Sequence, residues 1–491
     1  MHIFENENEH LRPYMKRRQI HAIIIILIGA VLSISFFDRI IIQAIISGTG
    51  LSLNEEFRMF GLQHLGIELI VLGSIIFLSA LMHNKNKLFL ISVIAVILLF
   101  FTFLYIYAVN IPINDDFEVI LNFSNRYFFS ENASEKSSLL SSYYCETRFI
   151  TLRFATIFLH FITGAVNFKS LIIIANCCLL VVLFLYCKSM SMKKCRMEIT
   201  LIIALLFFHF GYYDAVIWAT NAFVYQFTTA CVMLSLFLIN KSSVSSHIIA
   251  VISAILAALT FGNGLVVFPI VIFFFVLEKK WKFVFLWTAL AVLFFLIYFQ
   301  GFSSMNRVTS IHSLFDYIIY SCCFLGSAFQ FMYKLHLPFI AGGLIWALFI
   351  VLTIKKYYRK NFFIYGLIIF AIVSSLIAAH FRISKGLDES ISNRYGFFSI
   401  LVICSSIIAL SDIINERRQN SFLRMALGVC IAFHLLCGVF FFPEVPVRKQ
   451  KLEAFIDDIN NNAPVDLIRP IIPAGSDSIV KEAIRKEIYF P

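Results

Sequence analysis

The sequence predicts an all-α membrane protein, built as a polytopic bundle of transmembrane helices. Of its 491 residues, 60% are apolar and 14% are charged, and the mean hydropathy is +0.86. A soluble domain has about 25% charged residues and 45–50% apolar ones. Composition therefore excludes a soluble enzyme, a disordered chain, a coiled coil and a disulfide scaffold. Apolar runs recur along nearly the whole chain, which indicates helices and not an outer-membrane barrel.

The apolar runs define the predicted spans, because a spanning helix needs about 20 apolar residues. The first run follows Lys16, Arg17 and Arg18, and no small-residue cleavage site follows it, so we expect an anchor and not a signal peptide. The segment 316–332 is short and is expected to be interfacial or re-entrant. About 13 spans are predicted, at 20–37, 63–82, 88–109, 168–188, 198–213, 223–240, 246–262, 264–278, 282–300, 337–354, 361–380, 395–411 and 421–442.

Positive charge predicts the orientation of these spans. The net charge of +11 is no sign of a nucleic-acid partner here, since Lys and Arg gather in the cytoplasmic loops of membrane proteins. An N-inside, C-outside path places the basic clusters inside, whereas a crossing at 316–332 would move the later clusters outside. The clusters are Lys193, Lys194 and Arg196; Lys279, Lys280 and Lys282; Lys355, Lys356, Arg359 and Lys360; and Arg417 and Arg418.

Two regions outside the membrane are long. Residues 1–442 form the predicted transmembrane domain, and its first outside loop, 110–167, ends in an amphipathic stretch expected to lie along the membrane surface as a helix. Residues 443–491 form a proline-rich tail, expected to be a small helical appendage on the outer face. The apolar residues at helical spacing are Phe154, Ile157, Phe158 and Phe161 in the loop, and Leu452, Phe455, Ile456, Ile459, Val480, Ala483, Ile484 and Ile488 in the tail.

Asp115 and Asp116 are the candidate catalytic residues, because they open the first outside loop. A sugar-transfer reaction needs a base that takes the proton of the acceptor hydroxyl as it attacks the anomeric carbon. One carboxylate can do this, and a neighbouring carboxylate raises its pKa. The alternative is that the pair only caps a helix over Phe117–Phe123 or keeps the loop solvated.

A set of outside cations provides candidate phosphate contacts. Arg and Lys would bind the phosphate of a lipid-linked sugar and stabilise the charge that develops as the glycosidic bond breaks. The alternative for each cation is snorkelling at a helix end. The candidates are Arg148, Arg153, Arg382, Lys385 and Arg394, together with Tyr395 beside the last.

Polar residues also interrupt the apolar runs at two outside-facing breaks. Asp214, Trp218 and Tyr225 follow the short fifth span, and Asn263 lies in a Gly-Asn-Gly sequence. Non-helical backbone at this depth is tolerated only against protein or water, so these residues are expected to line a cleft. A simple tight turn is the alternative for Asn263. No ligand-like spacing of His or Cys is found, so neither a metal nor a cofactor is expected.

Read together, these residues resemble the GT-C class of membrane glycosyltransferases. The resemblance rests on Asp115-Asp116, the stretch from Arg148 to Gly164, the Trp218–Tyr225 break and Arg394-Tyr395. The pattern is similar to that of bacterial and phage-borne enzymes that add glucose to O-antigen from an undecaprenyl phosphate carrier. The resemblance implies a catalytic base in the Asp pair, a late Arg on the carrier phosphate, and a place in the bacterial inner membrane. Implied partners are the polyprenyl-phosphate sugar, a polysaccharide or lipid-linked acceptor, membrane lipids, a donor synthase and a donor flippase.

Two other functions remain open. An O-antigen polymerase would use Arg-rich outside loops with an Arg followed eleven positions later by Gly, which Arg153 and Gly164 match. A flippase or transporter of lipid-linked saccharides would be expected to show internal pseudo-symmetry and little mass outside the membrane. The early acidic loop favours the transferase over the polymerase, and the two long outside regions without an internal repeat favour it over the flippase.

Overall fold

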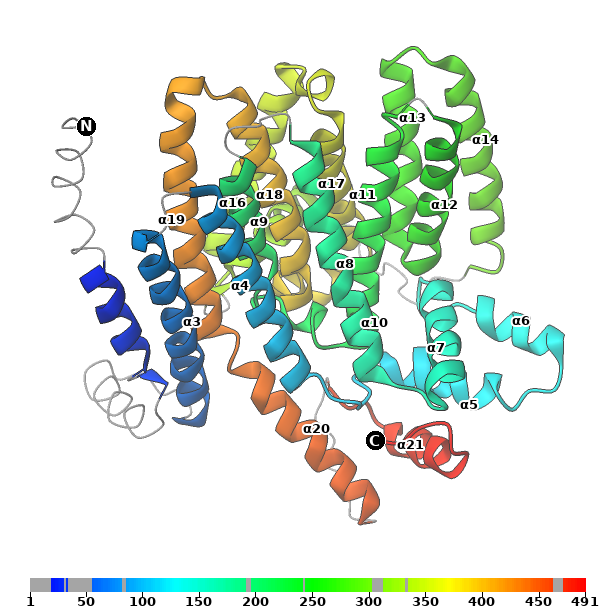
Figure 1. The fold of residues 1–491 in the computed structure, drawn as a ribbon. Helices are drawn as coiled ribbons and strands as arrows, with labels where there is room; N and C mark the ends of the chain where they lie inside the picture. The colour runs from blue at the N-terminus through cyan, green and yellow to red at the C-terminus, as the bar shows by residue number, and fades with distance from the viewer. Residues whose placement is uncertain are drawn as a thin grey trace, which may run out of the picture. The chain divides into compact units, whose positions relative to one another are not determined.

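The computed structural model describes residues 19–30, 32–33, 55–81, 85–190, 196–241, 243–302, 312–331, 334–461 and 471–491. Over these ranges the chain is helical, and it contains two isolated β-bridges but no named strand (Figure 1). The all-α prediction is confirmed there. The end of the first predicted span and the basic residues Lys193 and Lys194 lie outside the described residues.

Apolar helices long enough to cross a membrane recur through the described chain, which makes it a helical membrane bundle. Eight qualify by length and composition: Asn86–Tyr107, Phe168–Ser189, Ala219–Leu238, Trp281–Tyr298, His336–Ile354, Phe362–Lys385, Asn393–Ile413 and Glu416–Asn460. Six shorter apolar helices accompany them: Gln19–Ala30, Phe60–Ile75, Ile150–Thr163, Val244–Thr260, Gly262–Leu277 and Leu314–Leu325. The total of about 13 crossings and their orientation stay predictions.

The chain divides into two compact units. The first comprises Met1–Tyr107, Met192–Gly211 and Asn415–Arg448, and the second comprises Ala108–Ser191, Tyr212–Ile414 and Lys449–Pro491. The tail from Lys449 onward thus belongs to the same unit as the loop 110–167.

Four helices build the described core of the first unit. They are α3 (Glu55–Leu81), α4 (Lys85–Tyr107), α9 (Arg196–Phe207) and α19 (Glu416–Phe440). Helix α4 packs on α3 and α9, and α19 packs on the same two helices. Aromatic rings fill the space between them, namely Phe100, Phe103, Phe208, Phe210 and Phe442.

The second unit is a larger bundle whose long helices run side by side (Figure 1). In chain order its elements are α8 (Phe168–Ser189), α10 (Ala219–Ala222), α11 (Thr228–Leu238), α12 (Val244–Thr260), α13 (Val267–Leu277), α14 (Trp281–Tyr298), α15 (Leu314–Leu325), α16 (His336–Ile354), α17 (Phe362–Arg382) and α18 (Gly396–Ile413). Between α10 and α11 the five residues Phe223–Phe227 form a π-helix. Helix α15 has twelve residues and measures about 18 Å at 1.5 Å per residue, less than the roughly 30 Å of a hydrocarbon core.

The loop 110–167 folds into short helices at one end of this bundle (Figure 1). After a π-helical turn at Phe117–Asn122 come α5 (Phe123–Tyr127), α6 (Ala133–Ser141) and α7 (Ile150–Thr163). Helix α7 is the predicted amphipathic helix: Phe154, Phe158 and Phe161 are exposed, whereas Ile157 packs against Phe123 and Leu139. Its exposed apolar face suits the membrane surface.

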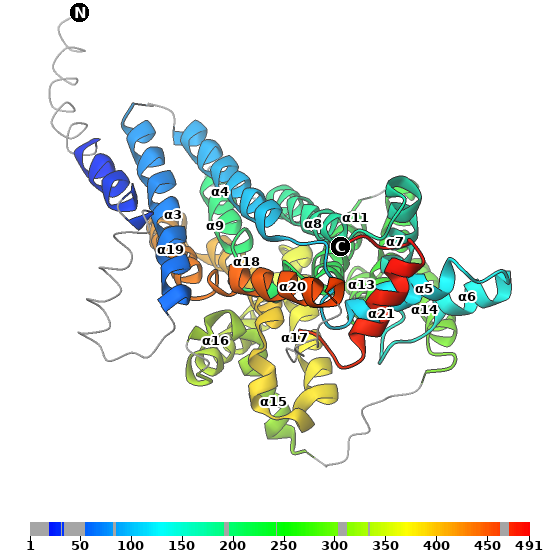
Figure 2. The ribbon, with the colours of Figure 1, turned by 90° about the horizontal axis from the view of Figure 1, so that it is seen from below.

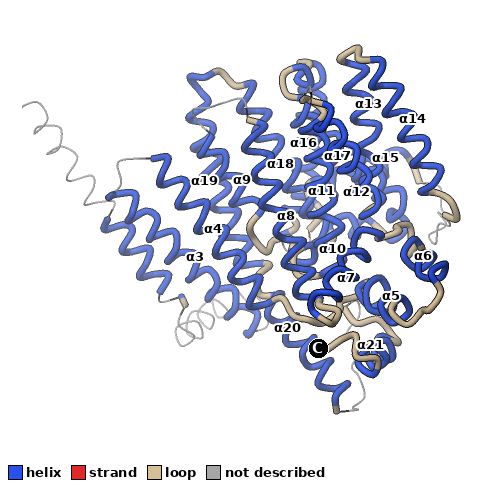
Figure 3. The backbone as a smooth tube through the Cα atoms, turned by 45° about the vertical axis from the view of Figure 1, so that its right-hand side comes forward, coloured by secondary structure: helices blue, strands red, loops and turns tan. Residues whose placement is uncertain are grey.

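The tail forms α20 (Glu444–Asn460) and α21 (Ser476–Arg485), and the predicted apolar positions Leu452, Phe455, Val480 and Ala483 are buried. Helix α21 lies beside α5, as the view from below shows (Figure 2). The final residues join the loop 110–167 through main-chain atoms, with the Val166 N–H donating to the Ile488 carbonyl at 2.7 Å. Figure 3 shows this end of the unit as short helices connected by loops.

Candidate functional site

The turn that carries the two acids is held by the tail. Asn114 has φ 44°, in the left-handed region that Asn tolerates better than most residues. Its N–H donates to the carbonyl of Ile471 at 2.9 Å. The backbone immediately before Asp115 is therefore fixed by a segment more than 350 residues further along the chain.

Asp116 is a buried hydrogen-bond acceptor. Its Oδ1 accepts from the N–H and the hydroxyl of Thr220, at 2.8 and 2.5 Å, and its Oδ2 accepts from the N–H of Ile113 at 3.1 Å. Thr220 lies in the first turn of the span Ala219–Leu238, where helix N–H groups have no partner within the helix. Burial raises the pKa of Asp116 to about 7, and the hydrogen bonds from Thr220 and Ile113 oppose a larger rise. Asp116 thus positions this helix end against the loop.

Asp115 is half-buried, and its carboxylate is less occupied. Its Oδ1 accepts from the hydroxyl of Tyr144 at 3.1 Å, whereas Oδ2 accepts no hydrogen bond from any described residue. Burial raises the pKa of Asp115, and the Tyr144 hydrogen bond opposes the rise. A carboxylate with one open oxygen and a raised pKa is suited to take a proton.

Three of the five predicted cations act on the Asp115 carboxylate. Their positive charges lower its pKa, in the order Arg394, Arg382 and Lys385, although burial remains the larger effect. Arg382 ends helix α17, and Lys385 follows it in a 3-10 turn. Arg394 pairs with Glu389 at 2.6 Å and keeps about a fifth of its side chain exposed. The structure thus brings the acid and these cations to one place in the second unit.

The neighbours of Arg394 hold its loop against the first predicted break. The Asn393 Oδ1 accepts from the N–H of Asp214 at 2.9 Å. The Tyr395 ring lies 4.5 Å from the ring of Phe324, and the Arg394 guanidinium lies 5.3 Å from the Tyr395 ring. Asp214 and Tyr395, both predicted from the sequence, are therefore part of this neighbourhood.

Arg148 and Arg153 have a different role. Arg148 donates to the carbonyls of Tyr298, Ser141 and Gln300, at 2.9, 2.7 and 2.6 Å. Arg153 is buried, and its Nη1 lies within 3.1 Å of four carbonyl oxygens, of Leu139, Leu140, Ser142 and Arg148. By satisfying carbonyls, Arg153 holds the loop 110–167 together and Arg148 ties it to the end of α14. Whether either also meets a phosphate stays a prediction.

The Arg153–Gly164 spacing is explained by helix α7 alone. Arg153 lies in its first turn, and Gly164 ends it with φ 76°, its N–H donating to the His160 carbonyl at 2.8 Å. A left-handed residue at this position of a helix is usually Gly. The spacing is therefore the length of one helix.

The predicted break residues are mostly buried. Trp218, Tyr225 and Asn263 are 5%, 4% and 7% exposed, and Asn263 lies in the 3-10 turn Gly262–Val266. That they line a cleft stays a prediction. Tyr225 interacts electrostatically with Arg394, which places it near the cations.

A buried polar network holds the backbone of the first break. Gln226 Nε2 donates to Asn176 Oδ1 at 2.9 Å and to the Ala215 carbonyl at 2.8 Å. Asn176 Nδ2 in turn donates to the Val216 carbonyl at 2.8 Å. Carbonyls left open by the interrupted helix are thus satisfied from α8 and from the π-helix.

Sequence reasoning missed three contributors to the site: Tyr144, Thr220 and Glu389. Thr220 stands two residues after Trp218, within the break already identified. Glu389 precedes Arg394 in the same short loop, where an acid beside a candidate cation was a usable signal. Tyr144 had no signal, since only the folded loop brings its hydroxyl to Asp115.

Among the described residues, no three His, Cys, Asp or Glu side chains are placed to hold a metal ion. Comparison with family models, curated proteins and solved structures finds no match to this chain. The class that fold and site define is a helical membrane protein with an acid-and-cation site beside its largest loop.

Proposed function

We propose that this protein is a membrane glycosyltransferase of the GT-C kind, which moves a hexose, most simply glucose, from a polyprenyl-phosphate carrier to a saccharide acceptor outside the bacterial inner membrane. The observation that carries the proposal is the half-buried Asp115 carboxylate, which keeps one oxygen open and whose pKa is lowered by the charges of Arg394, Arg382 and Lys385. A base beside an anion-binding group of cations is what this transfer requires.

In the proposed reaction the acceptor hydroxyl attacks the anomeric carbon of the lipid-linked sugar. The new carbon–oxygen bond forms as the bond from that carbon to the phosphate oxygen breaks. The hydroxyl proton passes to Asp115. The phosphate, still attached to the carrier lipid, leaves with the bonding electron pair on its oxygen. Arg394, Arg382 and Lys385 stabilise the departing negative charge, so the chemistry is complete with these side chains.

Asp115 is the better candidate for the base. Asp116 is 1% exposed and accepts three hydrogen bonds, whereas Asp115 keeps an oxygen open. Asp116 then acts as a positioning residue that ties the loop to the span beginning at Ala219.

The test is transfer of radiolabelled glucose from polyprenyl-phosphate-glucose to an extracted saccharide acceptor, using membranes that contain the full chain. Asp115→Asn is expected to lower the rate by about 10²–10⁴-fold, the usual contribution of a general base. Glu131→Gln, which removes an exposed charge from the same loop, is the matched control and is expected to leave the rate unchanged.

Full transfer by Asp115→Asn would exclude this mechanism. The flippase alternative predicts that the variant still moves lipid-linked saccharide across the membrane and that no transfer occurs with either chain. Analysis of the surface glycan of cells with and without the gene then identifies the sugar and the acceptor.

A further inference from the structure

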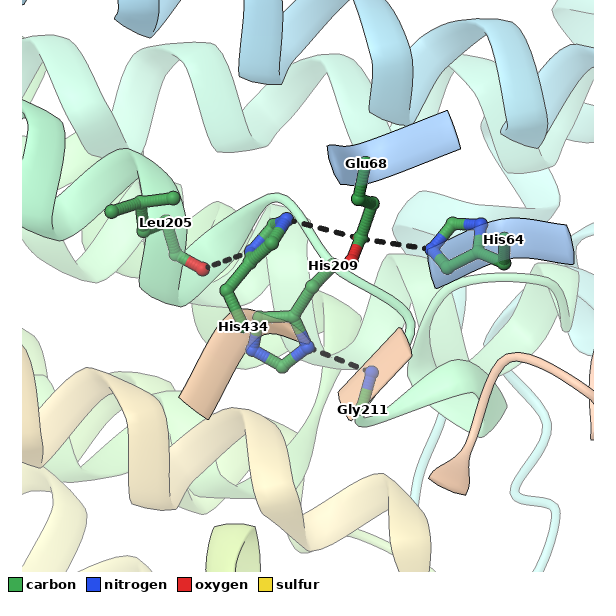
Figure 4. A network of polar contacts seen from close by, with 6 residues as sticks. All are labelled: His64, Glu68, Leu205, His209, Gly211 and His434. Carbon is green, nitrogen blue, oxygen red and sulfur yellow. Dashed lines mark hydrogen bonds and ion pairs between the residues drawn. The ribbon is translucent and has the colours of Figure 1, made fainter. Parts of the chain in front are cut away.

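Four ionisable side chains from three separate segments of the chain meet in the interior of the first unit (Figure 4). His64 and Glu68 stand one helical turn apart on α3, His434 comes from α19, and His209 follows α9. His64, Glu68 and His434 are 5–7% exposed. Ionisable groups at such positions in membrane bundles are costly and usually functional.

Glu68 Oε1 is the centre of this cluster. It lies 2.9 Å from Nε2 of His64 and 3.3 Å from Nε2 of His434. The His64 ring is held by Phe442, stacked at 3.8 Å, and by Phe103 at 4.7 Å. Two imidazoles from different helices therefore contact one carboxylate oxygen in apolar surroundings.

The second nitrogen of His434 determines the proton count. Its Nδ1 lies 2.8 Å from the carbonyl oxygen of Leu205, which can only accept, so Nδ1 carries a hydrogen. Nε2 of a neutral His434 would then present a lone pair to the Glu68 carboxylate. That contact is attractive only if a further proton lies between Nε2 and Oε1. Burial favours the same outcome, because one added proton makes the cluster neutral overall.

We propose that His64, Glu68 and His434 form a proton-binding site, which holds one proton between His434 of α19 and Glu68 of α3. The proton moves between Nε2 of His434 and Oε1 of Glu68, while the Nε2–H of neutral His64 donates to the same oxygen. Charge and atoms balance at each stage, and the cluster stays neutral. The site is separate from the proposed transferase site, which lies in the second unit.

The surrounding groups are compatible with one bound proton. His209 lies with its ring 5.9 Å from the His434 ring, and its Nδ1 accepts from the Gly211 N–H at 2.7 Å. The titratable groups near the cluster on the packed elements include Cys437 of α19, His209 after α9, and Tyr107 of α4, which packs against Phe442.

Solid-state NMR of the full chain in lipid nanodiscs, labelled with ¹⁵N-histidine, tests the proposal. At about pH 8 an ordinary His is neutral, since its pKa is about 6.5. We expect one imidazolium to persist in the wild type at that pH. It should be lost in Glu68→Gln and retained in His336→Gln, a control at an exposed histidine.

The wild-type spectrum decides the proposal even if Glu68→Gln does not fold. No imidazolium at about pH 8 in the wild type overturns it, and so does an imidazolium that survives Glu68→Gln. Signals that shift on adding EDTA or Zn²⁺ would identify a metal site and would also overturn it. His64→Gln is expected to keep the imidazolium, because His434 then holds the proton alone.

Discussion

Asp115 and Asp116 are neighbours in the chain, yet their carboxylates occupy different environments. Backbone and hydroxyl donors occupy the carboxylate of Asp116, whereas Asp115 accepts from a single phenol and has its pKa lowered by the charges of several cations. The difference arises because successive side chains of a turn point to different sides. The role of each carboxylate therefore depends on its hydrogen-bond donors and on its exposure, and neither can be read from the sequence.

The buried Asp116 predicts a pH dependence of stability. Its pKa is about 7 in the folded chain and about 3.9 when unfolded, so the folded state binds the proton more tightly. The free energy of unfolding should therefore fall as the pH rises from about 4 to about 7, by up to about 4 kcal/mol from this group. Thermal unfolding in detergent at about pH 5 and pH 7.5 measures the effect.

Asp116→Asn should flatten this dependence and also destabilise the protein by about 1–3 kcal/mol, because an amide cannot accept all three hydrogen bonds. Glu131→Gln serves again as the control. An unchanged pH slope in Asp116→Asn would show that another group is responsible.

Hydropathy was sufficient to predict most of the helices. The predicted spans 88–109, 168–188 and 337–354 correspond to α4, α8 and α16 within a few residues. A spanning helix is apolar over its whole length, so every one of its residues contributes to the hydropathy that predicts it. The partners of Arg148 could not be predicted in this way. They are main-chain carbonyls of residues 298 and 300, and every residue has a carbonyl that a guanidinium can bind once folding brings the two together.

The contact between α15 and α16 depends on one of two adjacent glycines. A Cβ on Gly342 would lie 1.8 Å from the carbonyl oxygen of Cys322, whereas a Cβ on Gly343 would meet nothing within 4 Å. We expect Gly342→Ala to separate the helices and to lower the free energy of unfolding by about 1–3 kcal/mol, the usual range for overpacking. Gly343→Ala should be neutral or slightly stabilising, since Ala is the better helix former.

Thermal unfolding of the two alanine variants in the same detergent makes the comparison directly. Their chemical change is identical and their positions differ by one residue, so lipid or detergent effects cancel. Equal midpoints for both variants would mean that α15 does not pack this closely on α16.

At the scale of the whole chain, the first unit carries information about topology. His434 of α19 lies beside Leu205 near the end of α9, and Cys437, further along α19, lies where a Cβ on Gly211, just after α9, would meet it, so α9 and α19 run in the same direction. Parallel spans require an odd number of crossings between them. Seven spans are predicted from 223–240 to 395–411, an odd number. Counting α15 as a further crossing would make the number even. The short α15 and the parallel pair thus support the same path.

The last prediction concerns which side of the membrane the acid-and-cation site faces. In a chain whose cysteines are first replaced by serine, Glu131→Cys marks the loop of Asp115 and Arg359→Cys marks a basic loop; both positions are exposed. A membrane-impermeant maleimide should label the first in intact spheroplasts and the second only after permeabilisation, because basic loops stay in the cytoplasm. The reverse pattern would place Asp115 inside the cell and would remove the basis for transfer outside the membrane.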